Sequence, residues 1–336
     1  MRVFDGHNDA LSRVARTGPG AADGFLAGDG SGHLDLPRAR RGGLGGGCFA
    51  VFTCRPPETA YDTGDYFAPV DPGRALAEAV EQVALLLRLE RASGGGLRVA
   101  RTAADLEGSG LAAVLHLEGA EPIGAALDEL ELFRAAGMRS LGLVWSRPNA
   151  FACGVPFAFP GSPYQGPGLS DAGRELVRAC GELGVLVDVS HLNARGFWDI
   201  AELGAGPLVA SHSAAHALCP SPRNLTDEQL RAVAERDGLV GINFHVGFVR
   251  ADGAEDADTP LATIAAHAAH VAEVAGVEAV GLGSDFDGAV MPAALGDAAG
   301  LPALLDALRA AGFGEAELEL IAHGNWRRVL EAAWTA

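Results

Sequence analysis

The chain contains no lysine, because all 25 basic residues among its 336 are arginine. This absence excludes catalysis through a lysine Schiff base and the lysine of a phosphate-binding P-loop. It also excludes a carboxylated lysine as the bridge between two metal ions. Any such bridge in this chain must therefore come from Asp or Glu.

Cysteine, positive charge and long apolar runs are also scarce. The five cysteines are scattered and odd in number, with no C-x-x-C spacing, which argues against a disulfide scaffold and favours small buried thiols. No run of roughly 18 apolar residues is present and no signal peptide precedes His7, so we expect a cytoplasmic protein with no membrane partner. The net charge of −18 argues against nucleic acid as a partner.

Eight short apolar runs alternate with helical patterns along the chain. Near-continuous apolar runs are typical of parallel strands that are buried on both faces. The count favours an α/β fold, a (β/α)8 TIM barrel that residues 1–336 form as one domain, with a doubly wound open sheet as the alternative. The expected strands are Arg2–Asp5, Gly47–Thr53, Ala112–Leu117, Ser140–Trp145, Val185–Ser190, Leu208–Ser211, Leu239–Phe244 and Ala279–Ser284.

Amphipathic spacing predicts helices between these strands. N-cap residues mark the start of two of these helices, Ser170 in one and Thr226 in the other. Gln229 completes a capping box with Thr226. The expected helices are Pro72–Ser93, Ala125–Ala136, Ser170–Leu183, Ala194–Leu203, Thr226–Arg236, Pro260–Ala275 and Leu301–Ala311.

Two segments lack either period. Ser146–Gly168 is rich in aromatic residues and proline and follows the fourth expected strand, at the end where barrel active sites lie. We therefore expect it to cover the substrate. Arg250–Thr259 is acidic, and we expect a solvated loop there.

Ionisable residues collect at the carboxyl ends of the expected strands. In the stretch Phe4–Asp9, alternation along a strand sends His7 and Asp9 to the same face, where both can reach one divalent metal. The residues at the other strand ends are Glu118, His191, His212 and Asp285.

In a barrel these strand ends share one rim, so the pattern predicts a metal centre. Three histidines and two carboxylates suit two metal ions, which can hold a hydroxide between them and polarise a carbonyl oxygen. Because no lysine is available, we expect Glu118 to bridge the two ions.

Five motifs appear in an order that resembles the membrane dipeptidase (renal dipeptidase) family, the zinc peptidases of family M19. They are Asp5-Gly6-His7-Asn8-Asp9, Glu118-Gly119, Asp188-Val189-Ser190-His191, Ser211-His212-Ser213 followed by Arg223-Asn224, and Ser284-Asp285-Phe286-Asp287-Gly288. The resemblance implies a metallo-dependent hydrolase barrel, a homodimer and two zinc ions per subunit. It implies that His7, Asp9 and Glu118 bind one ion and that Glu118, His191 and His212 bind the other.

The resemblance also implies Asp285 as the acid/base and Arg223 as the receptor of the dipeptide carboxylate. A guanidinium fork can hold a carboxylate with two hydrogen bonds. Asp287 could exchange roles with Asp285, although a hydrogen-bonding role suits it better. His116, two residues before Glu118, reads as a hydrogen-bonded core residue.

The sequence departs from the family after the fourth strand, where relatives of the kidney enzyme carry a histidine thought to touch the scissile carbonyl. Here Trp145 occupies that position. An indole donates one hydrogen bond but carries no charge. Either Trp145 donates to the substrate oxygen, or Arg147 or His245 takes over this role, or Trp145 only walls the pocket.

These features predict a binuclear zinc dipeptidase whose substrate is a small dipeptide, with L-Xaa-D-Xaa dipeptides as an implication of the family. The alternative is another metal-dependent amidohydrolase that acts on a lactam, a lactone or an N-acyl amino acid. A non-catalytic binding protein on the same scaffold is a third reading, which the complete set of ligand residues disfavours.

Overall fold

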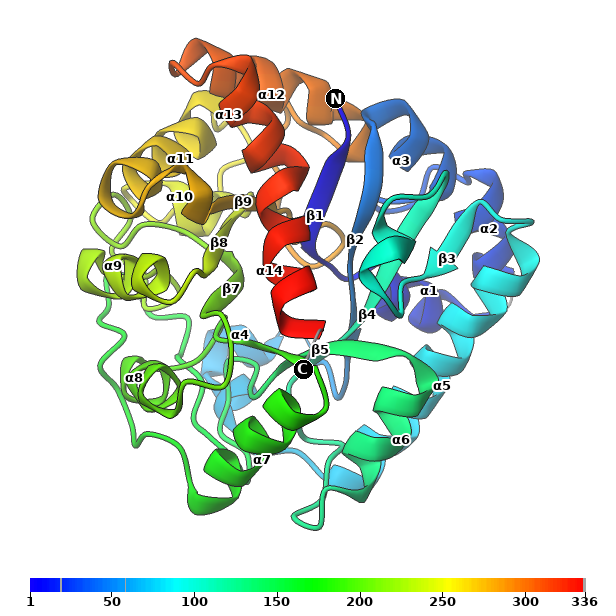
Figure 1. Cartoon of the computed structure of the whole chain (residues 1–336), viewed down its shortest axis with the longest axis vertical. Helices are drawn as coiled ribbons and strands as arrows, with labels where there is room; N and C mark the ends of the chain where they lie inside the picture. Colours follow the sequence, from blue (N-terminus) through cyan, green and yellow to red (C-terminus); the bar gives the residue numbers. More distant parts are fainter. Residues whose placement is uncertain (19, 58, 335–336) are drawn as a thin grey trace.

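Eight parallel strands form a closed ring in the computed structural model, which describes residues 1–18, 20–57 and 59–334 (Figure 1). Pairing of β2 with β4 closes the ring. The predicted (β/α)8 barrel is therefore confirmed, and the open sheet is excluded. Around the ring the strands are β1 (Val3–Asn8), β2 (Leu44–Phe52), β4 (Leu111–Glu118), β5 (Met138–Gly142), β6 (Leu186–Asp188), β7 (Val209–Ser213), β8 (Leu239–Asn243) and β9 (Val280–Gly283).

Helices surround the ring on its outer side (Figure 1). All seven predicted helices are present, and the caps at Ser170 and Thr226 form as expected. They are α5 (Pro72–Ala92), α6 (Asp128–Ala136), α7 (Asp171–Glu182), α8 (Ala194–Leu203), α9 (Asp227–Glu235), α11 (Leu261–Ala275) and α12 (Leu301–Ala310).

Several elements were not expected from the sequence. A short strand, β3 (Leu97–Val99), pairs with the start of β4 outside the ring. The additional helices are α1 (Ala10–Thr17), α2 (Ala21–Ala27), α3 (Leu36–Gly42), α4 (Thr59–Thr63), α10 (Val246–Val249), α13 (Glu315–Glu319) and α14 (Asn325–Trp334).

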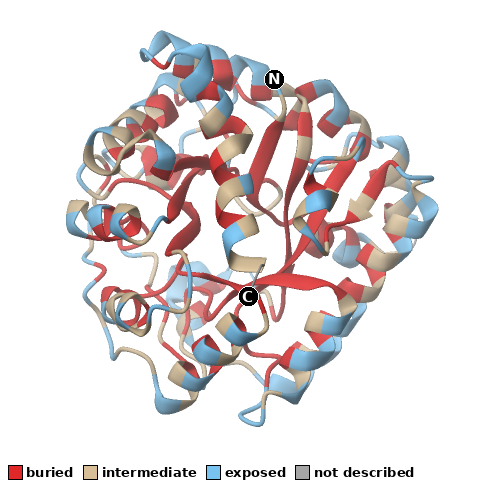
Figure 2. Cartoon of the chain, in the orientation of Figure 1, coloured by how far each residue is buried: buried red, intermediate tan, exposed pale blue. Residues whose placement is uncertain are grey.

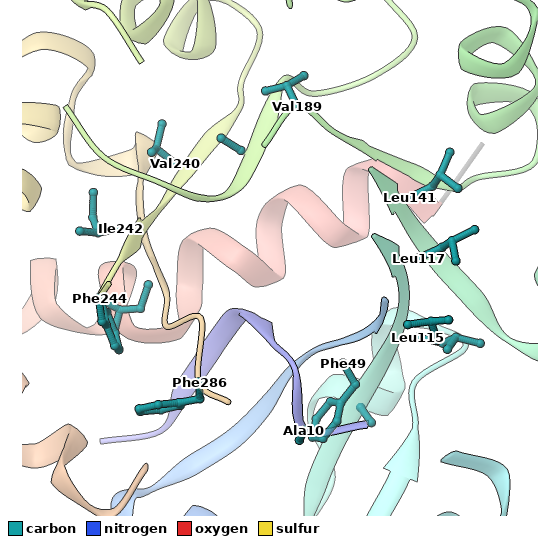
Figure 3. Close-up of a cluster of buried hydrophobic side chains, with 14 of the residues drawn as sticks. Ala10, Phe49, Leu115, Leu117, Leu141, Val189, Val240, Ile242, Phe244 and Phe286 are labelled. Carbon is teal, nitrogen blue, oxygen red and sulfur yellow. The ribbon is translucent and has the colours of Figure 1, made fainter. Parts of the chain in front are cut away.

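Alternation along the strands separates two cores. In β4, Leu115 and Leu117 belong to the outer core between strands and helices, whereas Ala112 and Val114 belong to an inner core. Figure 3 shows side chains of the outer core, including Leu115, Leu117 and Leu141, spread around the ring. Figure 2 shows that the strands are almost entirely buried, while exposed residues lie on the outer helices and loops.

Helix α14 closes the amino-terminal end of the barrel. Its Trp326 side chain is fully buried in the inner core, and its indole Nε1 donates to the Leu282 carbonyl at 2.9 Å. A Cβ at Gly6 would lie only 2.4 Å from the Trp326 ring, so glycine is needed there. With this end filled, the carboxyl ends of the strands remain for the functional site.

Candidate metal centre and substrate pocket

The predicted ligand residues come from five separate parts of the barrel. His7 lies at the end of β1, Asp9 precedes α1 and Glu118 ends β4, and all three are buried. His191 follows β6 and His212 lies in β7. The structure brings these five side chains together at the carboxyl rim. They form two groups of three that share Glu118, and within each group the ligand atoms lie within 4.8 Å of one another. One group is His7, Asp9 and Glu118, and the other is Glu118, His191 and His212.

Glu118 lies between the histidines, with one carboxylate oxygen toward each side. Its Oε2 is 3.6 Å from Nε2 of His7, and its Oε1 is 3.1 Å from Nε2 of His191 and 3.7 Å from Nε2 of His212. Oδ2 of Asp9 is 3.9 Å from Nε2 of His7. This arrangement offers two adjacent ligand groups that share one carboxylate.

Several polar atoms in this cluster are buried without a hydrogen bond among the described residues. Both ring nitrogens of His7 and Oδ1 of Asp9 are in this state. Nε2 of His191 faces Nε2 of His212 at 3.0 Å. Because buried polar groups are normally paired, and imidazole and carboxylate are ligands that zinc prefers, the residues fit divalent metal ions.

Hydrogen bonds beneath the cluster orient the ligand atoms. Ser211 donates its hydroxyl hydrogen to Asp188, so its oxygen accepts from Nδ1 of His212 at 2.8 Å. This leaves Nε2 of His212 as the bare nitrogen that a metal requires. Nδ1 of His191 contacts the Ser146 hydroxyl at 2.8 Å, and His116 is buried beside Ser140 at 3.0 Å.

The electrostatics of the histidines differ. Burial lowers the pKa of His191 to about 4, and the charge of Arg223 adds to this shift. Burial, together with His7, also holds the pKa of His212 well below its usual range. Both rings are therefore neutral near pH 7, with free lone pairs available as ligands.

The carboxylates of Glu118 and Asp9 determine the direction in which the pKa of His7 shifts. Burial lowers the pKa of His7, but Glu118 and Asp9 outweigh this effect and raise it to about 10. Burial raises the pKa of Glu118, yet His7 and His191 hold it well below its usual range. Burial and the charge of Glu118 raise the pKa of Asp9 to about 7. Closely spaced carboxylates of this kind require a nearby positive charge.

Asp285 lies next to the cluster, in one of the candidate ligand groups with His7 and His212. Its backbone has a φ of 63°, a left-handed conformation that is costly for a residue other than glycine and is shared by His191 at 65°. The Asp285 amide donates to the His7 carbonyl at 3.0 Å. Asn243 donates its side-chain amide to Oδ2 of Asp285 at 3.1 Å, a contact that the sequence did not indicate.

A pocket of about 760 Å³ opens over these residues. This volume is in the range of small-molecule sites. Asp9, Glu118, His191 and Asp285 lie at its polar end. An aromatic wall adjoins this end, with the ring centroid of Trp145 5.8 Å from that of His191. The wall is formed by Phe52, Tyr61, Tyr66, Trp145 and Phe157.

The three predicted substrate-binding residues occupy different positions. Trp145 and His245 line the pocket. The centroid of the Trp145 ring lies 5.2 Å from the ring centroids of both Phe52 and Phe157. This packing agrees with the reading in which Trp145 forms part of the pocket wall. Arg223 is only 3% exposed, donates to the His212 carbonyl at 3.1 Å and leaves its Nε without a partner among the described residues.

Arg147 does not fit the alternative role suggested for it. The side chain is 1% exposed and its guanidinium pairs with Glu121 at 2.8 Å. It also donates to the carbonyls of Thr53 and Cys54. Its guanidinium stacks 5.5 Å from the ring centroid of Phe52 and 5.4 Å from that of Trp145, but Arg147 itself does not line the pocket. The structure therefore does not support Arg147 as the replacement for the family histidine.

Asp287 also has a local structural role. Its carboxylate accepts from Nε of Arg13 at 2.9 Å and from the backbone amide of His33 at 2.5 Å. These bonds tie the segment after β9 to α1 and to the loop between α2 and α3. Asp285, whose carboxylate remains at the cluster, is the better candidate for proton transfer.

Two loops form the outer part of the pocket. Phe157, Ala158 and Phe159 of the segment Ser146–Gly168 line it, in agreement with the expected cover. The segment Arg250–Thr259 is not merely a solvated loop, because Gly253 and Glu255 also line the pocket. Oε1 of Glu255 lies 3.4 Å from Nε2 of His245.

Comparison with known proteins places these features in a family. The family model described as membrane dipeptidase (peptidase family M19) matches residues 1–336. The chain belongs to the membrane dipeptidase family. It is thus a metallo-dipeptidase-type hydrolase, as the sequence predicted. Despite the family's name, no helix in the described part of the chain has the length and apolar character needed to cross a bilayer.

Individual relatives are similar over most of the chain. A metallo peptidase from Rhodobacter sphaeroides, solved with a phosphinate mimic of the dipeptide L-Ala-D-Ala, is 44% identical with a TM-score of 0.95, covering 99% of both chains. The dipeptidase AC, of family M19, is 45% identical with a TM-score of 0.94, covering 100% of this chain and 99% of the other. Dipeptidase aclJ of Aspergillus oryzae is 30% identical and covers 89% of this chain and 69% of its own.

Proposed function

We propose that the chain is a binuclear zinc dipeptidase that hydrolyses the peptide bond of dipeptides, including L-Xaa-D-Xaa dipeptides. In this proposal His7, Asp9 and Glu118 hold one zinc ion, and Glu118, His191 and His212 hold the other. Residues 1–336 form one catalytic domain, in a cytoplasmic homodimer. Bound zinc would supply a hydroxide that bridges the two ions and a Lewis acid for the carbonyl oxygen.

One observation carries the metal assignment. The two oxygens of Glu118 face different histidines, at 3.6 Å from His7 and 3.1 Å from His191. Unpaired buried atoms of His7 and Asp9 lie on one side, and the facing nitrogens of His191 and His212 lie on the other. A shared carboxylate between two incomplete sets of donors is what a pair of ions would use.

The residues of the chain supply the rest of the reaction. Asp285, held by Asn243, is positioned to accept a proton from the attacking water and deliver it to the leaving amine. Arg223 is a buried cation near the cluster, because burial lowers its pKa only to about 10. It can therefore attract the free carboxylate of a dipeptide. The aromatic wall excludes water from the side-chain subsites.

The similarity to the Rhodobacter sphaeroides metallo peptidase supports the inclusion of L-Xaa-D-Xaa substrates, because that protein was solved with a mimic of L-Ala-D-Ala. The test is to measure zinc content and hydrolysis of L-L, L-D and D-L dipeptides together. Cleavage of L-L and L-D dipeptides by protein holding zinc is the expected result. Inactivity toward every dipeptide would refute the proposal.

Trp145 favours a second candidate, a metal-dependent amidohydrolase for a lactam, a lactone or an N-acyl amino acid. The indole replaces the histidine that relatives of the kidney enzyme place near the scissile carbonyl, so substrate recognition could differ. Arg223→Ala separates the two functions, because a dipeptidase should lose carboxylate binding and catalytic efficiency. A lactam or lactone without a carboxylate should be hydrolysed as before.

A further inference from the structure

Arg55 is a pocket-lining arginine whose charge the proposed reaction does not use. It lies just after β2 and is partly buried at the pocket wall. Its guanidinium makes no hydrogen bond or ion pair with residues 1–18, 20–57 or 59–334. By contrast, Arg13 is paired with Asp287, and Arg147 with Glu121. Arg55 therefore has donors free for a ligand.

In the described part of the chain, the Asp, Glu and Arg side chains that line the pocket are five carboxylates and one arginine. Among the described residues Arg55 is the one arginine that lines the pocket. A substrate carboxylate in the outer pocket would be attracted to this guanidinium. The carboxylates that line the pocket are Asp9, Glu118, Glu255, Asp285 and Asp287.

Arg55 and Arg223 act on different ends of the cluster. The charge of Arg55 lowers the pKa of Asp9, although burial and Glu118 keep that pKa raised overall, and it opposes the rise that burial causes in the pKa of Tyr61. The charge of Arg223 instead acts on His191 and His212. If Arg223 receives the main-chain carboxylate, Arg55 is left for a second negative group on the same substrate.

We propose that Arg55 selects dipeptides that carry an acidic side chain, by pairing its guanidinium with the side-chain carboxylate. The inference rests on the proposed dipeptidase function and specifies its substrate class. A guanidinium holds a carboxylate through two parallel hydrogen bonds, whereas the isosteric amide of asparagine gains no charge attraction. The enzyme should therefore distinguish aspartyl from asparaginyl dipeptides.

The test uses two matched substrate pairs, L-Asp-L-Ala with L-Asn-L-Ala and L-Ala-L-Asp with L-Ala-L-Asn. Zinc-loaded native enzyme should show a higher kcat/KM for the aspartyl member of at least one pair. In Arg55→Gln this ratio should fall by about tenfold, the size expected for one charge-assisted contact that is partly exposed to solvent. Arg55→Lys keeps the charge and should retain part of the preference.

Arg16→Gln is the matched control. Arg16 is a nearby arginine that interacts electrostatically with both Asp9 and Arg55 but does not line the pocket. Removing its charge tests the general field without removing a substrate contact. The Asp/Asn ratio should stay within about twofold of the native ratio in this variant, since the charge of an exposed side chain is screened by solvent and salt.

Two results in the variants would overturn the inference. The ratio could be the same in native enzyme and Arg55→Gln. Arg16→Gln could lower the ratio as much as Arg55→Gln, which would assign the preference to the general field. If the ratio is unchanged because all four substrates lose the same factor in Arg55→Gln, Arg55 is instead a receptor of the main-chain carboxylate. If native enzyme cleaves other dipeptides but none of these four, the inference on acidic side chains fails while the proposed function stands. If it cleaves no dipeptide at all, the proposed function itself fails.

Discussion

Replacing Asn243 tests how the barrel holds its proposed acid/base. Asn243 is fully buried at the end of β8, and its amide donates to Oδ2 of Asp285 at 3.1 Å. Its side-chain oxygen accepts from the backbone amide of His245 at 2.6 Å. Asn243→Ala removes both bonds and leaves Asp285 to hold its left-handed backbone without this support.

The expected loss follows from the type of bond. A hydrogen bond to a charged group contributes about 1.5–3 kcal/mol, which corresponds to roughly 10- to 100-fold in kcat/KM if it acts in the transition state. Asn243→Asp should lose more than Asn243→Ala, because it places a second carboxylate about 3 Å from Asp285. Zinc content should stay at the native value in Asn243→Ala, since Asn243 bonds to none of the five predicted ligands.

Asn325→Ala provides the matched control. Asn325 is also buried, and its amide donates to the carbonyls of Val277 and Val280 at 2.8 Å each, away from the pocket. This variant should lose stability but keep its kcat/KM for a dipeptide. The reasoning is refuted if Asn243→Ala stays within about threefold of native enzyme, or if both variants lose activity equally.

Three further predictions concern the pocket wall, pH and the barrel floor. Trp145→Phe should change kcat/KM by less than about threefold; a loss above about tenfold would show that the indole donates to substrate. Burial lowers the pKa of His267 to about 4. Because this is below the unfolded value, stability is present above about pH 6.5 and should fall by about 2 kcal/mol at pH 5. Chemical denaturation of His267→Gln should show a smaller fall, and an equal fall would contradict this account. Trp326→Ala should lower the free energy of unfolding by about 3–5 kcal/mol, and a loss under about 1 kcal/mol would contradict its role in the inner core.

The strands could be predicted because each is an apolar run bounded by turn residues. β3 could not be predicted, because a strand of three residues is too short to show an alternating pattern. The sequence pattern of α14 is amphipathic, but nothing in it reveals that Trp326 fills the end of the barrel. That role arises only from the closed ring, where Trp326 contacts residues far away in sequence.

The predicted site residues meet because the fold gathers strand ends at one rim. The supporting residues were hidden for different reasons. Asn243 reads as part of an apolar strand, and Arg55 lies in a segment with no period. From the sequence, Arg147 is a candidate pocket cation. Only the structure shows that Glu121 pairs with it at 2.8 Å. Such partners are set by tertiary contacts, which local patterns do not encode.

The most direct test of the central claim is the zinc content of native enzyme and of Glu118→Ala, measured by elemental analysis after the same zinc loading. If Glu118 joins two ions, native enzyme should hold about two zinc ions per chain. Glu118→Ala should hold fewer than about one and should not hydrolyse dipeptides. A native content of one zinc or fewer, or two zinc ions retained by Glu118→Ala, would contradict the shared-carboxylate centre.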